Sequence, residues 1–186
     1  MGIFNLIKNI TKAFNTVEDT PQKDSPSGKY RIGFDDENGS DYELEWNETD
    51  EGQGFVVKRI SDGQRLQWRT LARTEGLEAV PIVGVSYRKK ALQDSSFAPG
   101  KPLEIIPEPE NPHDPNAVGV WNQEKTLQVG YLPREYSDRI ARQGILIGTE
   151  KIGCMSMWEH LDGKKRVGLR VLMVLERAKI KGLYFK

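Results

Sequence analysis

Apolar residues recur at helical spacing near the start of the chain. Within residues 1–28, the apolar positions that share one helical face are Ile3, Phe4, Ile7, Ile10 and Phe14. This pattern predicts a short amphipathic helix, and the polar stretch 18–28 is typical of a flexible linker. Because a helix of about a dozen residues is marginal alone, we expect its apolar face to dock on the body of the protein, on a copy of itself or on a membrane surface. Two lysines make only a weak basic face, which favours docking on this protein, on a protein partner or by self-association over a membrane.

Alternation of apolar and polar residues then predicts strands in the extension 29–76. Four β-rich stretches lie at 30–34, 42–46, 55–60 and 65–70. Asn38-Gly39 and Asp62-Gly63 mark turns between them, which favours two hairpins. The stretch after Leu66 could instead be helical, ending near Gly76. About 45 residues are too few for an independent core, so we expect this extension to pack on the remainder.

The pattern in residues 77–186 predicts a small, partly open β-barrel. Short strands are expected at 80–87, 103–106, 117–121 and 127–131, followed by a hairpin of 153–160 and 166–175 over Asp162-Gly163. One helix begins at Pro133, presents Tyr136, Ile140 and Ala141 as its apolar face, and stops at Gly144. Many short strands with frequent Gly and Pro are typical of such barrels.

Composition narrows the class of protein. The 186 residues include one Cys and two His, which argues against a disulfide framework and against a Cys-rich zinc site. No signal peptide and no apolar run of about 20 residues is recognisable. We therefore expect a cytoplasmic protein that is not secreted and needs no cofactor.

Charge is divided unevenly, although 27 basic residues balance 27 acidic ones. Residues 1–76 carry 10 basic and 14 acidic residues, a net charge of −4, and residues 77–186 carry 17 and 13, a net of +4. Segment 35–51 holds nine acids and no base. Such asymmetry is compatible with a nucleic-acid-facing part beside an acidic part. We expect segment 35–51 to lie away from a DNA-binding face or to cover it.

Four ordered motifs in the third region carry a family resemblance. They are IVGVSYR at 82–88, PGKPLEII at 99–106, EPENPHDPNAV at 108–118 and VGYLPR at 129–134. This series resembles the HIRAN domain, a module of some Swi/Snf-type DNA translocases and of stand-alone bacterial proteins. The resemblance implies an OB-like barrel of about six strands with flanking helices. It also implies binding of single-stranded DNA at a free 3′ end.

Carried over by motif position, the resemblance implies a set of DNA-binding residues. They are Tyr87, Arg88, Lys89, His113, Asp114, Tyr131 and Arg134. Asp114 would accept a hydrogen bond from the terminal 3′-hydroxyl, and Arg134 would contact phosphate. Two positions depart from the eukaryotic form. Ser86 stands where an Arg precedes the Tyr of the first motif, and His113 stands where Tyr is preferred.

The residue types themselves, considered apart from the family, support part of this DNA-binding prediction. OB-type surfaces bind single strands through aromatic platforms and a basic groove, and Tyr87 and Tyr131 beside basic residues supply both. A carboxylate such as Asp114 suits a strand end, where a hydroxyl replaces the next phosphate. The dense Asn-Pro-x-Asp-Pro-Asn sequence also predicts a turn with Asx side chains capping backbone amides. Lys164, Lys165 and Arg166 form a basic hairpin tip, which is either a phosphate contact or a solvated turn.

Catalysis finds little support. The two histidines lie in different motifs, and Cys154 alternates with apolar residues, which predicts burial. No phosphate-cradling loop and no metal-ligand spacing is present. The leading hypothesis is a non-enzymatic single-stranded DNA-binding module in DNA repair, replication stress or defence. The alternatives are a protein-interaction module using the same barrel, and a metal-dependent nuclease built on Glu108, Glu110 and Asp114.

Overall fold

The computed structural model describes residues 30–33, 42–67, 77–143, 153–174 and 182–185. Several expectations fall outside these residues, namely the N-terminal helix and linker, the Asn38-Gly39 turn and the stretch 68–76. Within the described part, no helix is long and apolar enough to cross a membrane.

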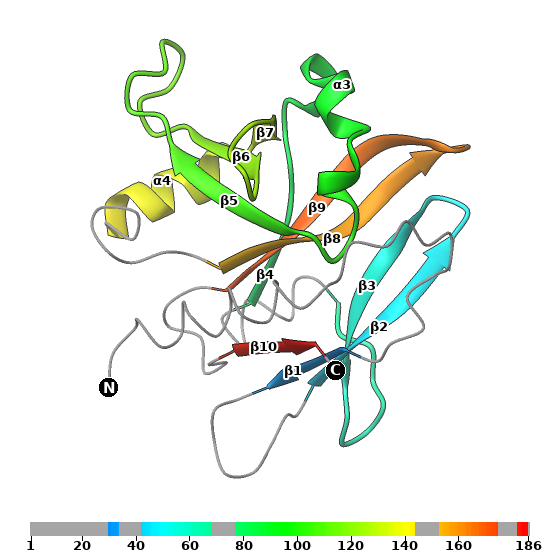
Figure 1. Cartoon of the computed structure of the whole chain (residues 1–186). Coiled ribbons are helices and arrows are strands. Elements are labelled where there is room, and N and C mark those ends of the chain that lie inside the picture. The colour runs from blue at the N-terminus through cyan, green and yellow to red at the C-terminus, as the bar shows by residue number, and fades with distance from the viewer. Residues whose placement is uncertain (1–29, 34–41, 68–76, 144–152, 175–181, 186) are drawn as a thin grey trace.

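Antiparallel strands dominate the described residues (Figure 1). The ten strands are β1 (Tyr30–Gly33), β2 (Tyr42–Thr49), β3 (Gly52–Arg59), β4 (Leu77–Pro81), β5 (Pro102–Pro107), β6 (Val118–Asn122), β7 (Gln128–Tyr131), β8 (Gly153–Asp162), β9 (Lys165–Val174) and β10 (Gly182–Phe185). They pair in the order β10-β1-β2-β3-β8-β5-β6-β7, and β9 joins β8 to β4.

Six of these strands form the barrel, in the order β4-β9-β8-β5-β6-β7. The edge strands β4 and β7 do not pair along their length. Among the described residues, one isolated bridge connects Val83, just after β4, with Tyr131 of β7. Val83 donates its amide hydrogen to the Tyr131 carbonyl at 2.9 Å and accepts the Tyr131 amide hydrogen at 3.0 Å. The sheet is therefore mainly antiparallel, not closed, and compatible with an OB-like open barrel, as the sequence predicted.

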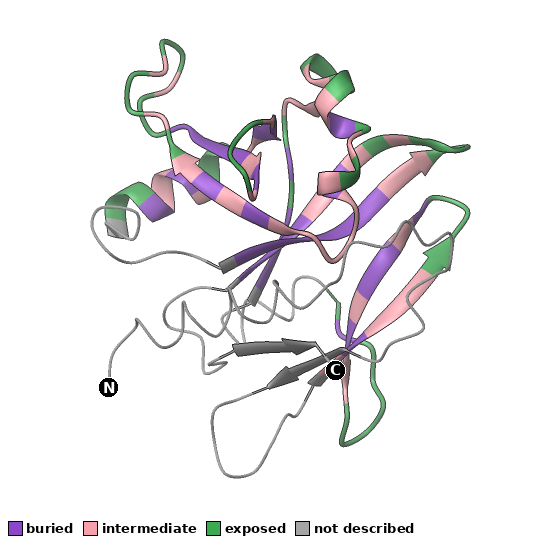
Figure 2. Cartoon of the chain, in the orientation of Figure 1, coloured by how far each residue is buried: buried purple, intermediate pink, exposed green. Residues whose placement is uncertain are grey.

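Apolar side chains from the barrel strands fill its core. Val80, Val120, Val129, Leu169 and Val171 are among its almost fully buried members. They lie at alternate strand positions, as expected when one face of a pleated strand points inward. In Figure 2 the buried positions follow the strands, and exposed ones gather on the β5–β6 loop and on α3.

The helices are short, and two of them correct the sequence interpretation. They are η1 (Val85–Tyr87), α3 (Lys89–Leu92), η2 (Ser95–Phe97) and α4 (Arg134–Gln143). The strand predicted at 80–87 ends at Pro81, because Gly84 takes a φ of 75° and turns the chain into η1. α4 matches the predicted helix, but Ala141 is exposed while Ile140 is buried.

The extension joins the barrel by strand pairing. Gly52, Gln53 and Gly54 of β3 pair with His160, Glu159 and Trp158 of β8. A Cβ atom on Gly52 would lie 2.2 Å from the Glu159 carbonyl oxygen, so this contact requires glycine. The C-terminal strand β10 pairs with β1 and not with the barrel. The extension and β10 thus make one continuous sheet with the barrel strand β8.

Two details of the extension bear on the sequence interpretation. The Asp62-Gly63 turn is confirmed, since the Gly63 amide donates to the Arg59 carbonyl at 2.9 Å. The strand expected at 65–70 is wrong for its described residues, because Arg65 makes only an isolated bridge with Lys58. In β2, Glu45 forms an ion pair with Arg65 at 3.0 Å, so part of the acidic segment is neutralised locally.

Candidate nucleic-acid interface

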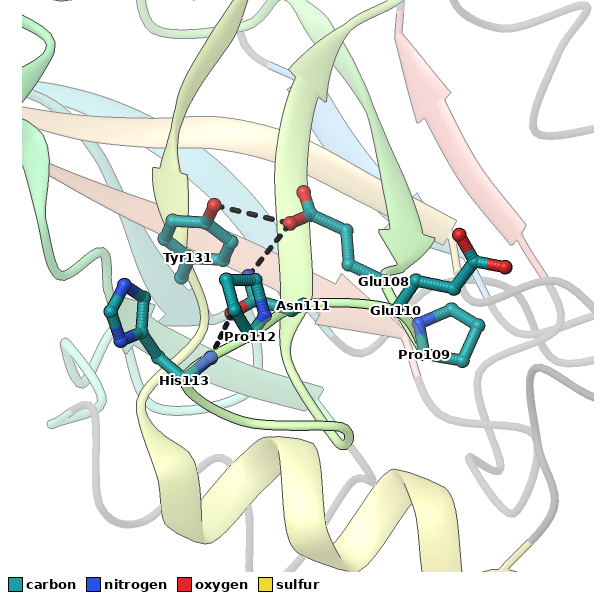
Figure 3. Close-up of a pocket in the computed structure, with 7 residues that line it drawn as sticks. All are labelled: Glu108, Pro109, Glu110, Asn111, Pro112, His113 and Tyr131. Carbon is teal, nitrogen blue, oxygen red and sulfur yellow. Dashed lines mark hydrogen bonds between the residues drawn. The ribbon is translucent and has the colours of Figure 1, made fainter.

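An open pocket of about 630 Å³ lies where the β5–β6 loop meets the end of β7. Its lining residues are Glu108, Pro109, Glu110, Asn111, Pro112, His113 and Tyr131. Figure 3 shows the His113 ring and the Tyr131 ring on the same side of the pocket, with Pro112 beside them. Two residues implied by the motif resemblance therefore line one cavity.

The loop is shaped by Asx turns, as the sequence predicted. Asn111 accepts the His113 amide hydrogen at 3.0 Å through its side-chain oxygen, and Asp114 Oδ1 accepts that of Asn116 at 2.9 Å. Glu108 donates its amide hydrogen to the Ala117 carbonyl at 2.8 Å, which closes the base of the loop. These bonds fix the backbone that presents His113 and Asp114.

Glu108 is the centre of a hydrogen-bond network at the back of the pocket. Its Oε1 accepts from Gln128 Nε2 at 2.7 Å, and its Oε2 accepts from Asn111 Nδ2 at 3.0 Å and from the Tyr131 hydroxyl at 3.1 Å. Three neutral donors thus hold one carboxylate and fix the position of the Tyr131 ring.

Arg88 connects this network to the η1–α3 segment. Its Nη2 donates to the Tyr131 hydroxyl at 3.1 Å, and its guanidinium carbon lies 5.3 Å from the centroid of the Tyr131 ring. This is a cation–π arrangement. The neighbouring Tyr87 is 93% exposed, and Lys89 and Lys90 are exposed as well. Arg88 therefore contacts the pocket residue Tyr131, and an exposed aromatic ring and two exposed lysines are its neighbours in the chain.

Asp114 and Arg134 lie together beside the pocket. Arg134 Nε is 3.8 Å from Asp114 Oδ2 and 3.8 Å from Asp138 Oδ2. The Arg134 side chain is 80% exposed, whereas that of Asp114 is 23% exposed. One oxygen of Asp114 is occupied by its turn, and the other faces a guanidinium that is largely accessible to solvent.

Contacts join four of the seven predicted site residues in two pairs, Arg88 with Tyr131 and Asp114 with Arg134, and His113 lines the pocket together with Tyr131. Tyr87 ends η1, Arg88 follows it and Lys89 begins α3, where the sequence predicted a strand end and a loop. Sequence reasoning missed Gln128 and considered Glu108 only as a metal ligand. A polar residue within a predicted strand, as Gln128 is, was the available signal.

The described residues also bear on the expectations for the thiol and for metal binding. Cys154 is buried as predicted, and burial raises the pKa of its thiol far above the ordinary value. Among the described residues, no cluster of three or more His, Cys, Asp or Glu side chains could hold a metal ion.

Comparison with known proteins agrees with the motif resemblance over one part of the chain. Residues 76–143 match the family model of the HIRAN domain. Among solved structures, the chain is similar to a protein from Lactobacillus plantarum determined by a structural genomics consortium. The identity is 19% and the TM-score 0.35, over 53% of this chain and 96% of that one. No curated protein matches the chain.

Proposed function

We propose that this protein binds single-stranded DNA without catalysing a reaction, and that it prefers a free 3′ end, in DNA repair, replication stress or defence. The match of residues 76–143 to the HIRAN domain supports this class of function. The observation that carries it is the exposed Tyr87 next to the Arg88–Tyr131 pair, at the rim of a pocket that adjoins Asp114 and Arg134.

Base stacking is the proposed role of the aromatic residues. Tyr87 is 93% exposed, so its ring is accessible to a nucleic-acid base. Every base has a π-face, so such a ring binds single strands with little sequence preference. Arg88, Lys89 and Lys90 supply positive charge for the phosphates next to the stacked bases.

End recognition is the proposed role of Asp114. A carboxylate among phosphates is repulsive, but a terminal 3′-hydroxyl donates a hydrogen bond to it. The proposed role of Arg134, whose Nε lies 3.8 Å from Asp114 Oδ2, is to contact the phosphate on the 5′ side of the same nucleotide. A 3′-phosphate would instead bring two negative groups together and weaken binding.

Fluorescence anisotropy with oligonucleotides ending in a 3′-hydroxyl or a 3′-phosphate tests both roles. Tyr87→Ala lowers affinity by about 5- to 150-fold, because one stacked base contributes about 1–3 kcal/mol. Asp114→Asn keeps an oxygen for the Asn116 amide but removes the charge, so discrimination between the two oligonucleotides is expected to diminish. Ile60→Ala, at another exposed apolar residue, is the matched control and leaves affinity unchanged.

Each outcome bears on one part of the proposal. Absence of binding by the wild type at low salt rejects DNA binding and favours the protein-interaction alternative. Equal affinity for both oligonucleotides rejects end recognition and leaves single-strand binding in place. Release of nucleotides on addition of Mg²⁺ or Mn²⁺ would contradict the non-enzymatic character.

A further inference from the structure

Four exposed lysines lie on two elements beyond the pocket. Lys89 and Lys90 belong to α3, and Lys164 and Lys165 lie at the tip of the β8–β9 hairpin. No ion pair within the described residues involves any of these four side chains. Asp162 is the exposed acid at the same hairpin tip, so the tip carries a net positive charge.

Arg166 is not part of this exposed basic group, although the sequence places it next to Lys165. Its side chain is only 10% exposed and forms an ion pair with Glu159 through Nε. Its Nη1 donates to the Leu92 carbonyl at 2.6 Å and to the Asp94 carbonyl at 3.0 Å. For Arg166, the structure thus shows neither the solvated turn nor the phosphate contact that the sequence left open, because its side chain fastens the end of α3 to the start of β9.

A second pair of bonds makes the same connection. The Gln93 side chain donates to the Arg166 carbonyl at 2.6 Å and accepts the Arg166 amide hydrogen at 3.1 Å. Because four hydrogen bonds join the α3 segment to Arg166, α3 and the hairpin tip form one fixed surface. In Figure 1, α3 and the β8–β9 hairpin lie on the same side of the barrel.

Consecutive contacts lead from the pocket to this surface. Tyr131 lines the pocket, Arg88 binds the Tyr131 hydroxyl, Lys89 and Lys90 follow Arg88 in the chain, and Gln93 reaches the hairpin. We propose that a single strand whose 3′ end occupies the pocket continues across α3 to the β8–β9 tip, where Lys164 and Lys165 contact its phosphates. This inference rests on the proposed function and adds a second, backbone-reading site to it.

Counterion release makes the inference quantitative. Each phosphate contact on a single strand contributes a slope of about −0.7 to the dependence of log affinity on log salt concentration. At about 0.1 M salt this corresponds to about fivefold in affinity for each contact. A strand that is too short to reach the hairpin tip gains nothing from Lys164 and Lys165. A longer strand is expected to bind more tightly and with a steeper salt dependence.

Binding of a trinucleotide and a dodecanucleotide, both with free 3′-hydroxyls, tests the second site. Lys164→Glu is compared with Lys125→Glu, which makes the same charge change at another exposed turn lysine. Lys125 lies between β6 and β7, at the end of these strands that is remote from Tyr131. We expect Lys164→Glu to lower dodecanucleotide affinity by about fivefold or more and to reduce the salt slope, with trinucleotide affinity unchanged.

The outcomes separate the two proposals. If the wild type binds both oligonucleotides but Lys164→Glu behaves like Lys125→Glu, the second site is wrong and the proposed function stands. The same conclusion follows if Lys164→Glu weakens the trinucleotide and the dodecanucleotide equally. If the wild type binds neither oligonucleotide, both the proposed function and the second site are rejected.

Discussion

Two glutamates, Glu108 and Glu159, each hold several elements of the fold together, but they do so with different partners. Glu159 is 6% exposed, and it accepts from Gln53 of the extension at 2.6 Å and pairs with Arg166. Glu108 is partly exposed at the pocket and accepts from Gln128, Asn111 and Tyr131, which are all neutral.

The two glutamates differ in the partner of the nearby arginine. At Glu159 the charge of Arg166 is neutralised inside the protein, because both side chains are buried and form an ion pair. At Glu108 the nearest described arginine in the network, Arg88, binds the Tyr131 hydroxyl and not the carboxylate. The Glu108 network therefore does not pair the charge of Arg88 with its carboxylate, and under the proposed function that charge serves a ligand, whereas the Glu159 network neutralises the charge of Arg166 within the fold.

The largest expected effect comes from removing the buried cation. Arg166→Met leaves Glu159 without its ionic partner and the carbonyls of Leu92 and Asp94 without a donor. We expect the free energy of unfolding in urea to fall by about 3–5 kcal/mol. Arg65→Met breaks the exposed pair with Glu45 and is expected to cost less than about 1 kcal/mol. Equal losses in the two variants would mean that the buried pair of Arg166 stabilises the fold no more than the exposed pair of Arg65.

A smaller effect is expected at the pocket. Glu108→Gln preserves shape but turns one acceptor oxygen into an amide that faces donors. The free energy of unfolding should fall by about 1–3 kcal/mol, because one of the groups that donate to Glu108 would face the new amide and lose its acceptor at a partly exposed site. Urea unfolding measures this, with Glu110→Gln on the exposed loop as the control that changes stability little. A loss as large as that of Arg166→Met would mean that Glu108 also serves mainly the fold.

Tyr131→Phe removes only the hydroxyl that lies between Arg88 and Glu108. The ring remains, so the expected loss in unfolding free energy is about 0.5–1.5 kcal/mol, typical of a net hydrogen bond. Tyr136→Phe on α4 is the matched tyrosine variant outside the pocket network. If Tyr131→Phe costs nothing, the hydroxyl contacts do not organise the site.

The smallest expected effect is a loss of stability in acid that depends on His160, which lies where β8 pairs with β3. Burial, aided by the charge of Arg170, lowers the pKa of His160 below its ordinary value of 6.5. The unfolded chain then binds a proton more readily than the folded one, so stability falls as pH decreases through about 6.5. Urea unfolding at about pH 8 and pH 5.5 should show this loss, and a smaller one in His160→Gln. An equal loss in that variant would assign the pH dependence to other groups.

Local signals in the sequence were sufficient for several elements. Pro133 and the apolar residues that follow predicted α4, and Asp162-Gly163 predicted the β8–β9 turn. The Asx turns around Asn111 and Asp114 also follow from residues within a few positions of each other. Such features depend on short-range chemistry, and a single sequence contains all of it.

Contacts between residues far apart in the chain could not be predicted from the sequence. Arg166 was predicted as the third member of a basic tip, but its burial depends on the carbonyl groups of Leu92 in α3 and of Asp94 just after it. The positions of Tyr87 and Lys89 depend on Gly84, where a left-handed turn interrupts what reads as one apolar strand. The role of Glu108 likewise required Tyr131 and Gln128 to arrive from β7.

The pairing of β1 with β10 has a consequence for the order of folding during synthesis. Tyr30 pairs with Phe185, so the strand that completes the extension sheet leaves the ribosome after every strand of the barrel. Until then β1 has an unpaired edge, and such edges pair readily with other chains. The strands β1, β2 and β3 can pair early, but the outer partner of β1 waits for the whole barrel to be made.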